Sequence, residues 1–264
     1  MQVAVVSRHE PVVQTPQYSL AERAELLCGP AFPAHLAVWR EALEAQRRDG
    51  VVPASYLVAM RSVVAREAAS GAMGSDDSVA AAVAIAGVGG EDAVHASGTL
   101  LQELSAFGIT AAEILRVAVA LIAPSRAALA QARLDLLAIS RSGTENERTT
   151  VRCLLGETYL ARGGAPANEA IAFRLFMAAA DEACPAAAAA HFHLGVWYAQ
   201  EGTDADLLLA IHHFERGAER GSAQCLRALS DVHRGSDGHY AQELLELADL
   251  TEGGAPPAHP VLHL

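Results

Sequence analysis

A short pattern of leucine, glycine and tyrosine occurs twice in the second half of this 264-residue chain. It reads LGETY from Leu155 and LGVWY from Leu194, so the glycines are Gly156 and Gly195. Leucine and tyrosine four residues apart lie on one face of an α-helix. The glycine beside them has no side chain, which lets a second helix approach closely. The pattern therefore predicts two copies of a helix that packs tightly against a partner.

The second helix of each copy also has a recurring pattern of residues. Small residues recur at helical spacing around a single phenylalanine, as two closely packed helices require. The pattern continues weakly before residue 150 and after residue 222. Self-similarity with this period is typical of an α-solenoid, in which each helix pair buries its faces against its neighbours. The small and aromatic positions are Ala172, Phe176, Ala179 and Ala180 in the first copy, and Ala210, Phe214, Gly217 and Ala218 in the second.

The segment LGETYLARGGAPANEAIAFRLFMAAADEA resembles the Sel-one-like repeat, a longer-looped relative of the tetratricopeptide repeat. The resemblance implies a right-handed α-solenoid over residues 125–250, in a bacterial protein that binds other proteins. This functional implication is an analogy between folds. The last unit departs from the pattern, because Ser230 replaces glycine and His233 replaces tyrosine. Residues 1–124 resemble no family.

Composition supports an all-α fold for the whole chain. Hydrophobic residues make up 52% but aromatic residues only 5%, so alanine, a strong helix former, dominates the apolar content. We expect a loose arm at 1–17, an Ala-rich helical region at 18–124, the repeats at 125–250 and a disordered tail at 251–264. The expected helices are 19–28, 34–50, 53–70, 77–87, 91–106, 111–122 and 126–141, then 146–162, 168–183, 187–201, 205–220, 222–234 and 239–249.

Charge and cysteine content narrow the partners and the compartment. The net charge of −12 disfavours nucleic acid, whose binding depends on lysine and arginine, and suits a partner that is basic. The four cysteines form no closely spaced pair, which favours a reducing, cytoplasmic location. We find no secretory signal and no apolar run long enough for membrane insertion. The oligomeric state is not predicted.

The sequence contains no convincing pattern for a metal site, a phosphate-binding site or a catalytic site. Six of the eleven histidines lie between His191 and His239, but His191 and His193 do not share a helix face. We therefore expect no metal site. Glycines 87, 89 and 90 fail the phosphate-binding pattern, because Asp92 occupies the last glycine position. In the absence of a catalytic motif, we expect neither a cofactor nor an enzyme.

The first helix of each repeat is the expected binding surface, because solenoids bind partners on an extended concave face. By resemblance to the tetratricopeptide arrangement, six positions are expected to be exposed there. An alternative is that some of them, above all Phe192 and Val196, pack against the N-terminal helices. Rival hypotheses are a translocated effector or secretion chaperone, and an enzyme with its site in residues 1–124. The six positions are Glu157, Phe192, Val196, Gln200, Arg227 and Asp231.

Overall fold

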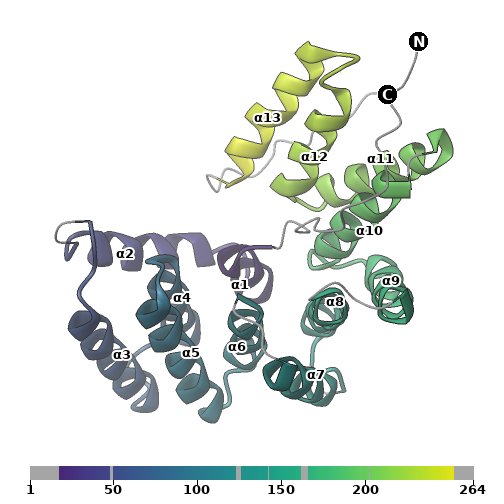
Figure 1. Ribbon diagram of the computed structural model, residues 1–264. Helices are drawn as coiled ribbons and strands as arrows, with labels where there is room; N and C mark the ends of the chain where they lie inside the picture. The colour runs from purple at the N-terminus through teal and green to yellow at the C-terminus, as the bar shows by residue number, and fades with distance from the viewer. Residues whose placement is uncertain are drawn as a thin grey trace.

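The computed structural model describes residues 18–47, 50–122, 126–141, 143–161, 166–201 and 203–252. Within these ranges the chain forms thirteen α-helices and no strand, which confirms the all-α prediction (Figure 1). The predicted arm at 1–17 and nearly all of the predicted tail lie outside the described residues.

Six helices form the N-terminal region, close to the predicted positions. A capping box is present at Ser19, with the Glu22 backbone N–H donating to Ser19 Oγ and the Ser19 N–H donating to Glu22 Oε2. The helix that follows Ser19 ends at Gly29, whose φ of 92° suits glycine. The helices are α1 (Leu20–Cys28), α2 (Phe32–Glu44), α3 (Ala54–Ala69), α4 (Ser75–Gly87), α5 (Glu91–Ala106) and α6 (Thr110–Ile122).

Helix α2 differs most from its expected range of 34–50. It begins at Phe32 because Pro33 fits the first turn, where no backbone N–H is needed. It ends at Glu44, one residue after Leu43, the last buried side chain of the helix. Since most helical stability comes from packing of an apolar face, the polar residues after Leu43 do not extend the helix.

Seven helices form the rest of the described chain. A second capping box joins Thr144 and Glu147. The helices are α7 (Arg126–Ile139), α8 (Glu145–Leu160), α9 (Pro166–Ala180), α10 (Ala187–Glu201), α11 (Asp204–Ala218), α12 (Ala223–His233) and α13 (Gly238–Glu252).

The helices pack in chain order from α4 to α13, each against the next (Figure 1). Helices α6, α8, α10 and α12 also contact one another in sequence, as the first helices of stacked pairs do. These contacts agree with helical repeats. The right-handed solenoid expected for residues 125–250 stays a prediction.

Both predicted close crossings are present. A Cβ atom added at Gly156 would lie 2.6 Å from the Phe176 ring, and one at Gly195 would lie 2.4 Å from the Phe214 ring. Each phenylalanine therefore occupies the space left by the glycine of its own helix pair. In the last pair Ser230 takes the glycine position, and its hydroxyl donates a 2.8 Å hydrogen bond to the Ala241 carbonyl of α13.

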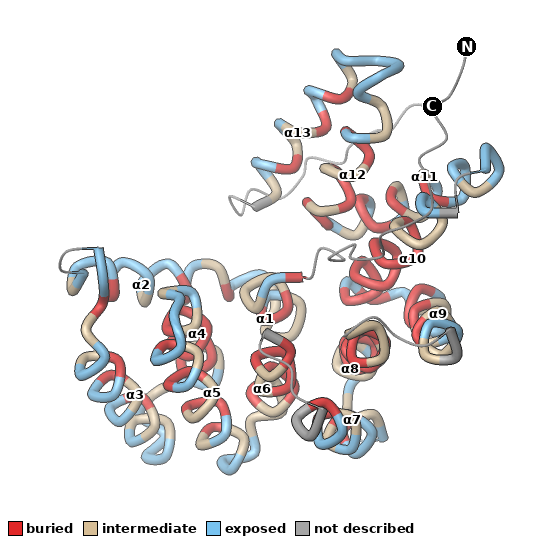
Figure 2. Tube along the Cα trace, in the orientation of Figure 1, coloured by how far each residue is buried: buried red, intermediate tan, exposed pale blue. Residues whose placement is uncertain are grey.

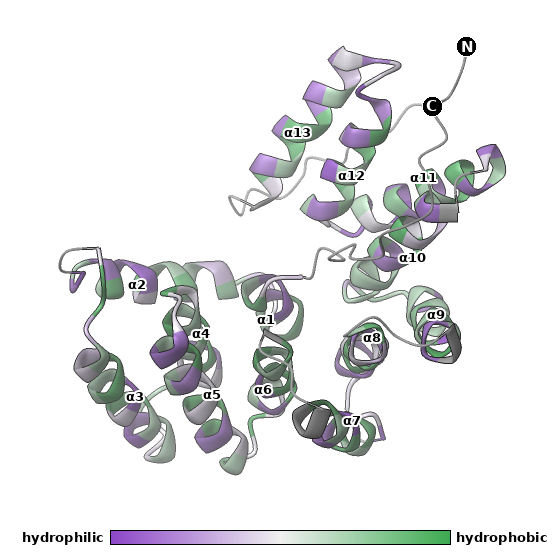
Figure 3. Ribbon diagram, viewed as in Figure 1, coloured by the Kyte–Doolittle hydropathy of each residue, from purple (hydrophilic) through white to green (hydrophobic). Residues whose placement is uncertain are grey.

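Three hydrophobic clusters form the core, and α1 joins them. One cluster lies among α1–α6, another among α6–α8, and the third among α8–α13. Leu20 and Leu27 pack against the first two clusters. Tyr18 belongs to the third cluster, and Leu26 packs against it. Figure 3 shows α6 as hydrophobic around much of its circumference, in keeping with its contacts to α1, α5, α7 and α8. The core thus continues across the predicted domain boundary at residues 124 and 125.

Candidate functional site

The segment from Tyr18 to Leu26 lies against the first helices of the repeats. We call the residues that contact it the α1-facing surface. Its centre is buried, as the colours around α1 and α8 in Figure 2 show. The α1-facing surface consists of Asn146 and Glu157 of α8, Phe192 of α10, and Ser222 and Gln224 at the start of α12.

A buried ion pair forms the centre of this contact. Arg23 Nη2 donates to Glu157 Oε2 over 2.6 Å, and both side chains are under 5% exposed. The Arg23 Nε–H donates to the Tyr18 carbonyl over 3.0 Å, which fixes the guanidinium. A charged group buried this deeply is tolerated only when it is paired and hydrogen-bonded. The pair therefore ties α1 to α8 across 134 residues of sequence.

A histidine completes the coordination of the Glu157 carboxylate. His193 Nε2 lies 3.0 Å from Glu157 Oε1, and the His193 ring stacks on Phe176 with a centroid distance of 4.4 Å. Burial acts to raise the pKa of the Glu157 carboxyl, but the Arg23 charge and the His193 hydrogen bond outweigh it and hold that pKa at about 2. Glu157 is therefore ionised at neutral pH.

An aromatic contact and further hydrogen bonds extend the segment toward α12. The Tyr18 ring meets the Phe192 ring edge to face at 6.0 Å, and its hydroxyl is 2.7 Å from Ser222 Oγ. Gln224 Nε2 donates to Glu22 Oε2 over 3.0 Å, so the capping carboxylate of α1 also binds α12. At the other end Asn146 Nδ2 donates to the Leu26 carbonyl.

The exposure expected of Glu157 and Phe192 is wrong, because the N-terminal segment covers both. The alternative that some of the six positions pack against N-terminal residues describes these two. Val196 is half-buried and Gln200 is exposed. These contacts could not be predicted because the partners are far apart in the sequence. The repeat pattern does not identify Arg23 as the partner of Glu157 or Tyr18 as the partner of Phe192.

The remaining two positions lie on α12. Arg227 Nη2 is 3.2 Å from Asp249 Oδ1 of α13, so this arginine is already in an ion pair. Asp231 is exposed and lies 2.6 Å from Arg234 Nη2. Val196, Gln200, Arg227 and Asp231 thus form the part of the predicted face that the segment Tyr18–Leu26 leaves uncovered.

The histidines come together from separate helices but do not form a metal centre among the described residues. His191 faces His213 of α11, with 3.1 Å between their Nδ1 atoms, whereas His193 faces Glu157. Across the described part of the chain, no three histidine, cysteine or acidic side chains are grouped so that they could hold a metal ion.

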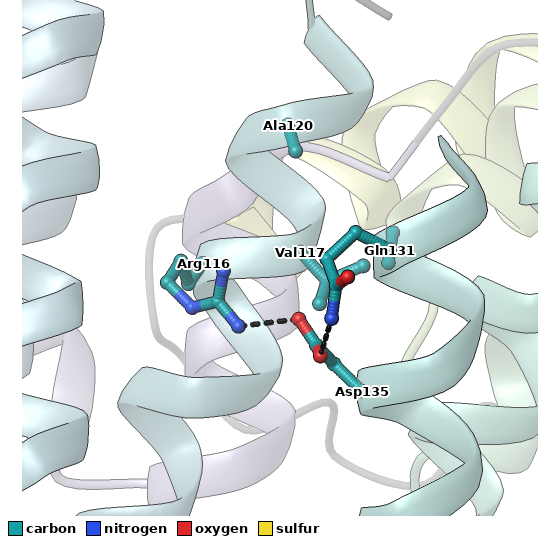
Figure 4. A pocket seen from close by; sticks show the side chains of 6 residues that line it. Arg116, Val117, Ala120, Gln131 and Asp135 are labelled. Atoms are coloured by element: carbon teal, nitrogen blue, oxygen red, sulfur yellow. Dashed lines mark hydrogen bonds and ion pairs between the residues drawn. The ribbon is translucent and has the colours of Figure 1, made fainter. Parts of the chain in front are cut away.

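A small cavity lies between α6 and α7 (Figure 4). Its volume is about 120 Å³. Asp135 accepts hydrogen bonds from Arg116 Nη2 at 2.6 Å and from Gln131 Nε2 at 2.8 Å, so both carboxylate oxygens are engaged. The cavity therefore contributes no unpaired acid or base to the hypothesis of an enzyme site. Its lining is Arg116, Val117, Ala120, Gln131, Ala132 and Asp135.

Comparison of the chain with models of protein families, with curated proteins and with solved structures finds no match in any of the three. The likeness to the Sel-one-like repeat therefore stays a prediction that rests on the quoted residues. Among the described helices, none is both long enough and apolar enough to cross a membrane.

Proposed function

We propose that the chain is a non-enzymatic adaptor, chaperone or regulator that binds a protein or peptide segment on the first helices of its repeats. One observation carries the proposal. The α1-facing surface already holds a peptide segment through an aromatic contact at Phe192 and an ion pair at Glu157. A buried aromatic anchor beside a desolvated charge pair is the composition of an interface hot spot.

The uncovered part of the same face would receive the partner. Val196 and Gln200 continue the α10 surface beyond Phe192, and Arg227 and Asp231 continue α12 beyond Gln224. This part combines one apolar side chain with polar neighbours, as the edge of an interface does. The net charge of −12 favours a partner segment that is basic.

A peptide added in trans tests whether the surface recognises a segment by its arginine. Arg23→Ala should destabilise the full chain by about 3–5 kcal/mol, because it leaves the Glu157 carboxylate buried without its partner. A synthetic peptide of residues 18–28 should then raise the melting temperature of this variant toward that of the parent. The same peptide with alanine in place of arginine should not.

The design separates recognition from general stabilisation. Arg234→Ala removes an arginine from an exposed pair, 67% exposed on each side, and should change stability by under about 1 kcal/mol. Neither peptide should affect this control variant. If the two peptides act alike on the Arg23→Ala chain, or neither acts at millimolar concentration, the surface does not bind a segment in this way and the proposal loses its support.

A further inference from the structure

The cavity between α6 and α7 has an apolar interior (Figure 4). Its most buried lining residues are Val117 of α6 and Ala132 of α7, which are 1% and 4% exposed. Ala120 lies about one helical turn beyond Val117 on α6 and adds a third hydrocarbon side chain. A molecule that enters the cavity would therefore meet mainly methyl groups.

The polar side chains of the lining bind one another. Arg116 Nη2 lies 2.6 Å from Asp135 Oδ2, and Gln131 Nε2 lies 2.8 Å from Asp135 Oδ1. Figure 4 shows the end groups of Arg116 and Gln131 converging on this one carboxylate. Both oxygens of Asp135 thus have donors from the protein itself and need none from a ligand.

The charges of the lining cancel. Of the six described residues that line the cavity, Arg116 and Asp135 are the charged ones, and they form an ion pair with each other. A carboxylate in the cavity would be repelled by Asp135, and an ammonium group would be repelled by Arg116. A charge moved out of water without a partner is unfavourable. The cavity therefore favours an uncharged ligand.

Size and access set further limits on the ligand. The cavity has a volume of about 120 Å³, and an apolar cavity of about 150 Å³ accepts benzene. Gln131 is exposed and Arg116 is half-buried, so the polar side of the cavity faces solvent and gives a route of entry. A ligand of about the size of benzene fits these limits.

We propose that the cavity between α6 and α7 is a binding site for a small, uncharged, apolar molecule. Burial of the ligand against Val117, Ala120 and Ala132 supplies the binding energy. The two helices lie on either side of the predicted domain boundary at residues 124 and 125, so a bound ligand stabilises the junction between the two regions. The site is separate from the α1-facing surface and does not depend on a partner there.

Titration of the full chain with benzene tests the site. The methyl groups of alanine and valine are labelled with ¹³C, because an aromatic ring shifts the signals of methyl groups that it contacts. We expect saturable shifts for Val117, Ala120 and Ala132, with a dissociation constant of about 1 mM for a ligand of this size. Absence of saturable shifts up to the solubility limit of benzene would overturn the proposal.

Charged analogues test the chemical class of the ligand. Benzoate and benzylammonium carry the same ring with opposite charges, and both should bind at least about tenfold more weakly than benzene. If either binds as tightly as benzene, the ligand is not selected for lack of charge. Asp135→Asn removes the carboxylate that neutralises Arg116. Benzoate can then supply a carboxylate to Arg116, so it should bind this variant at least about tenfold more tightly than the parent protein. No gain in benzoate binding would contradict the role of the ion pair.

Two leucine substitutions give the decisive comparison. Ala120→Leu places its added atoms in the cavity and should weaken benzene binding at least about tenfold without lowering the melting temperature. Ala130→Leu adds the same atoms at an exposed position of α7 and should leave binding unchanged. Ala132→Val fills the cavity from α7 and provides a second test if Ala120→Leu does not fold. Equal weakening by the cavity variants and by Ala130→Leu would overturn the proposal.

Discussion

Replacing Gly195 by alanine tests the close crossing of α10 and α11 with a single methyl group. The added Cβ would lie 2.4, 2.5 and 2.9 Å from three carbon atoms of the Phe214 ring. Carbon atoms in favourable contact are about 3.5–4.0 Å apart, so the ring would have to move by about 1 Å. Phe214 is only 3% exposed, so the ring has to move within the buried core. We expect a net loss of about 1–3 kcal/mol, the usual cost of overpacking a core.

Gly98 provides the matched control, because it also lies inside a helix. A Cβ atom there would be 3.6 Å from Val119 Cγ1, which is an ordinary contact. Gly98→Ala should therefore stabilise the chain by about 0.5–1 kcal/mol through helix propensity alone. Circular dichroism at 222 nm during thermal unfolding measures both variants. Gly195→Ala should lower the melting temperature by roughly 2–8 °C.

A second substitution identifies the cause of the loss. Phe214→Leu removes the ring that the new methyl group strikes, so the double variant should be more stable than the sum of the two single effects predicts. If Gly195→Ala melts with the parent protein, or its loss simply adds to that of Phe214→Leu, the ring does not fill the space left by glycine. The assignment of the repeat would then be wrong.

Three further predictions concern protonation and reactivity. Burial and nearby positive charges hold the pKa of His191 at about 3 and that of His213 at about 4. Because the unfolded chain takes up protons first, the free energy of unfolding should fall as the pH drops below about 6.5. Melting curves should show a smaller fall for His213→Phe than for the parent protein. The lowered pKa of Glu157 adds stability that is complete above about pH 4.5 and disappears toward pH 2, so Glu157→Gln should flatten the acid limb of the same curve. Burial raises the pKa of the Cys225 thiol to about 12 and that of Cys153 further, so a thiol reagent at pH 8 should modify both only after denaturant is added.

Local rules were enough to locate most helices. Helices α5 and α10 have the predicted bounds of 91–106 and 187–201, and the Ser19 capping box is present. Each of these rests on residues close in sequence, such as a glycine before an acidic first turn. The contacts of Gly156 and Gly195 were also predictable, because both partners of each contact belong to the same helix pair.

Contacts of the N-terminal segment could not be predicted in this way. The position of Glu157 in the repeat implied an exposed side chain, since the analogy with tetratricopeptide proteins includes no helix that covers it. Arg23 is 134 residues away and lies in a region without a recognisable family. Only tertiary packing brings the two together, and the capping box at the start of α1 gives no hint of where that helix docks.

Burial at equivalent repeat positions shows how far the segment Tyr18–Leu26 extends. The position three residues before the glycine is Cys153 in the first pair and Phe192 in the second, which are 1% and 4% exposed. The equivalent residue of the third pair is Arg227, whose side chain is 37% exposed. The same position in the repeat thus holds a buried side chain in the first two pairs, Cys153 and Phe192, and a half-buried one, Arg227, in the third.

The side chain one residue after the glycine also becomes more exposed from the first helix pair to the third, and its contacts change with it. Glu157 is 3% exposed and ion-paired with Arg23, Val196 is half-buried against the apolar cluster, and Asp231 is 67% exposed. Since the backbone register is the same in all three pairs, the difference comes from what lies opposite each position. The segment covers the surface at α8, reaches α10 and stops at the start of α12. A partner segment that binds without displacing α1 would therefore have to dock at the α12 end, where Asp231→Arg should weaken it and Glu157→Gln should not.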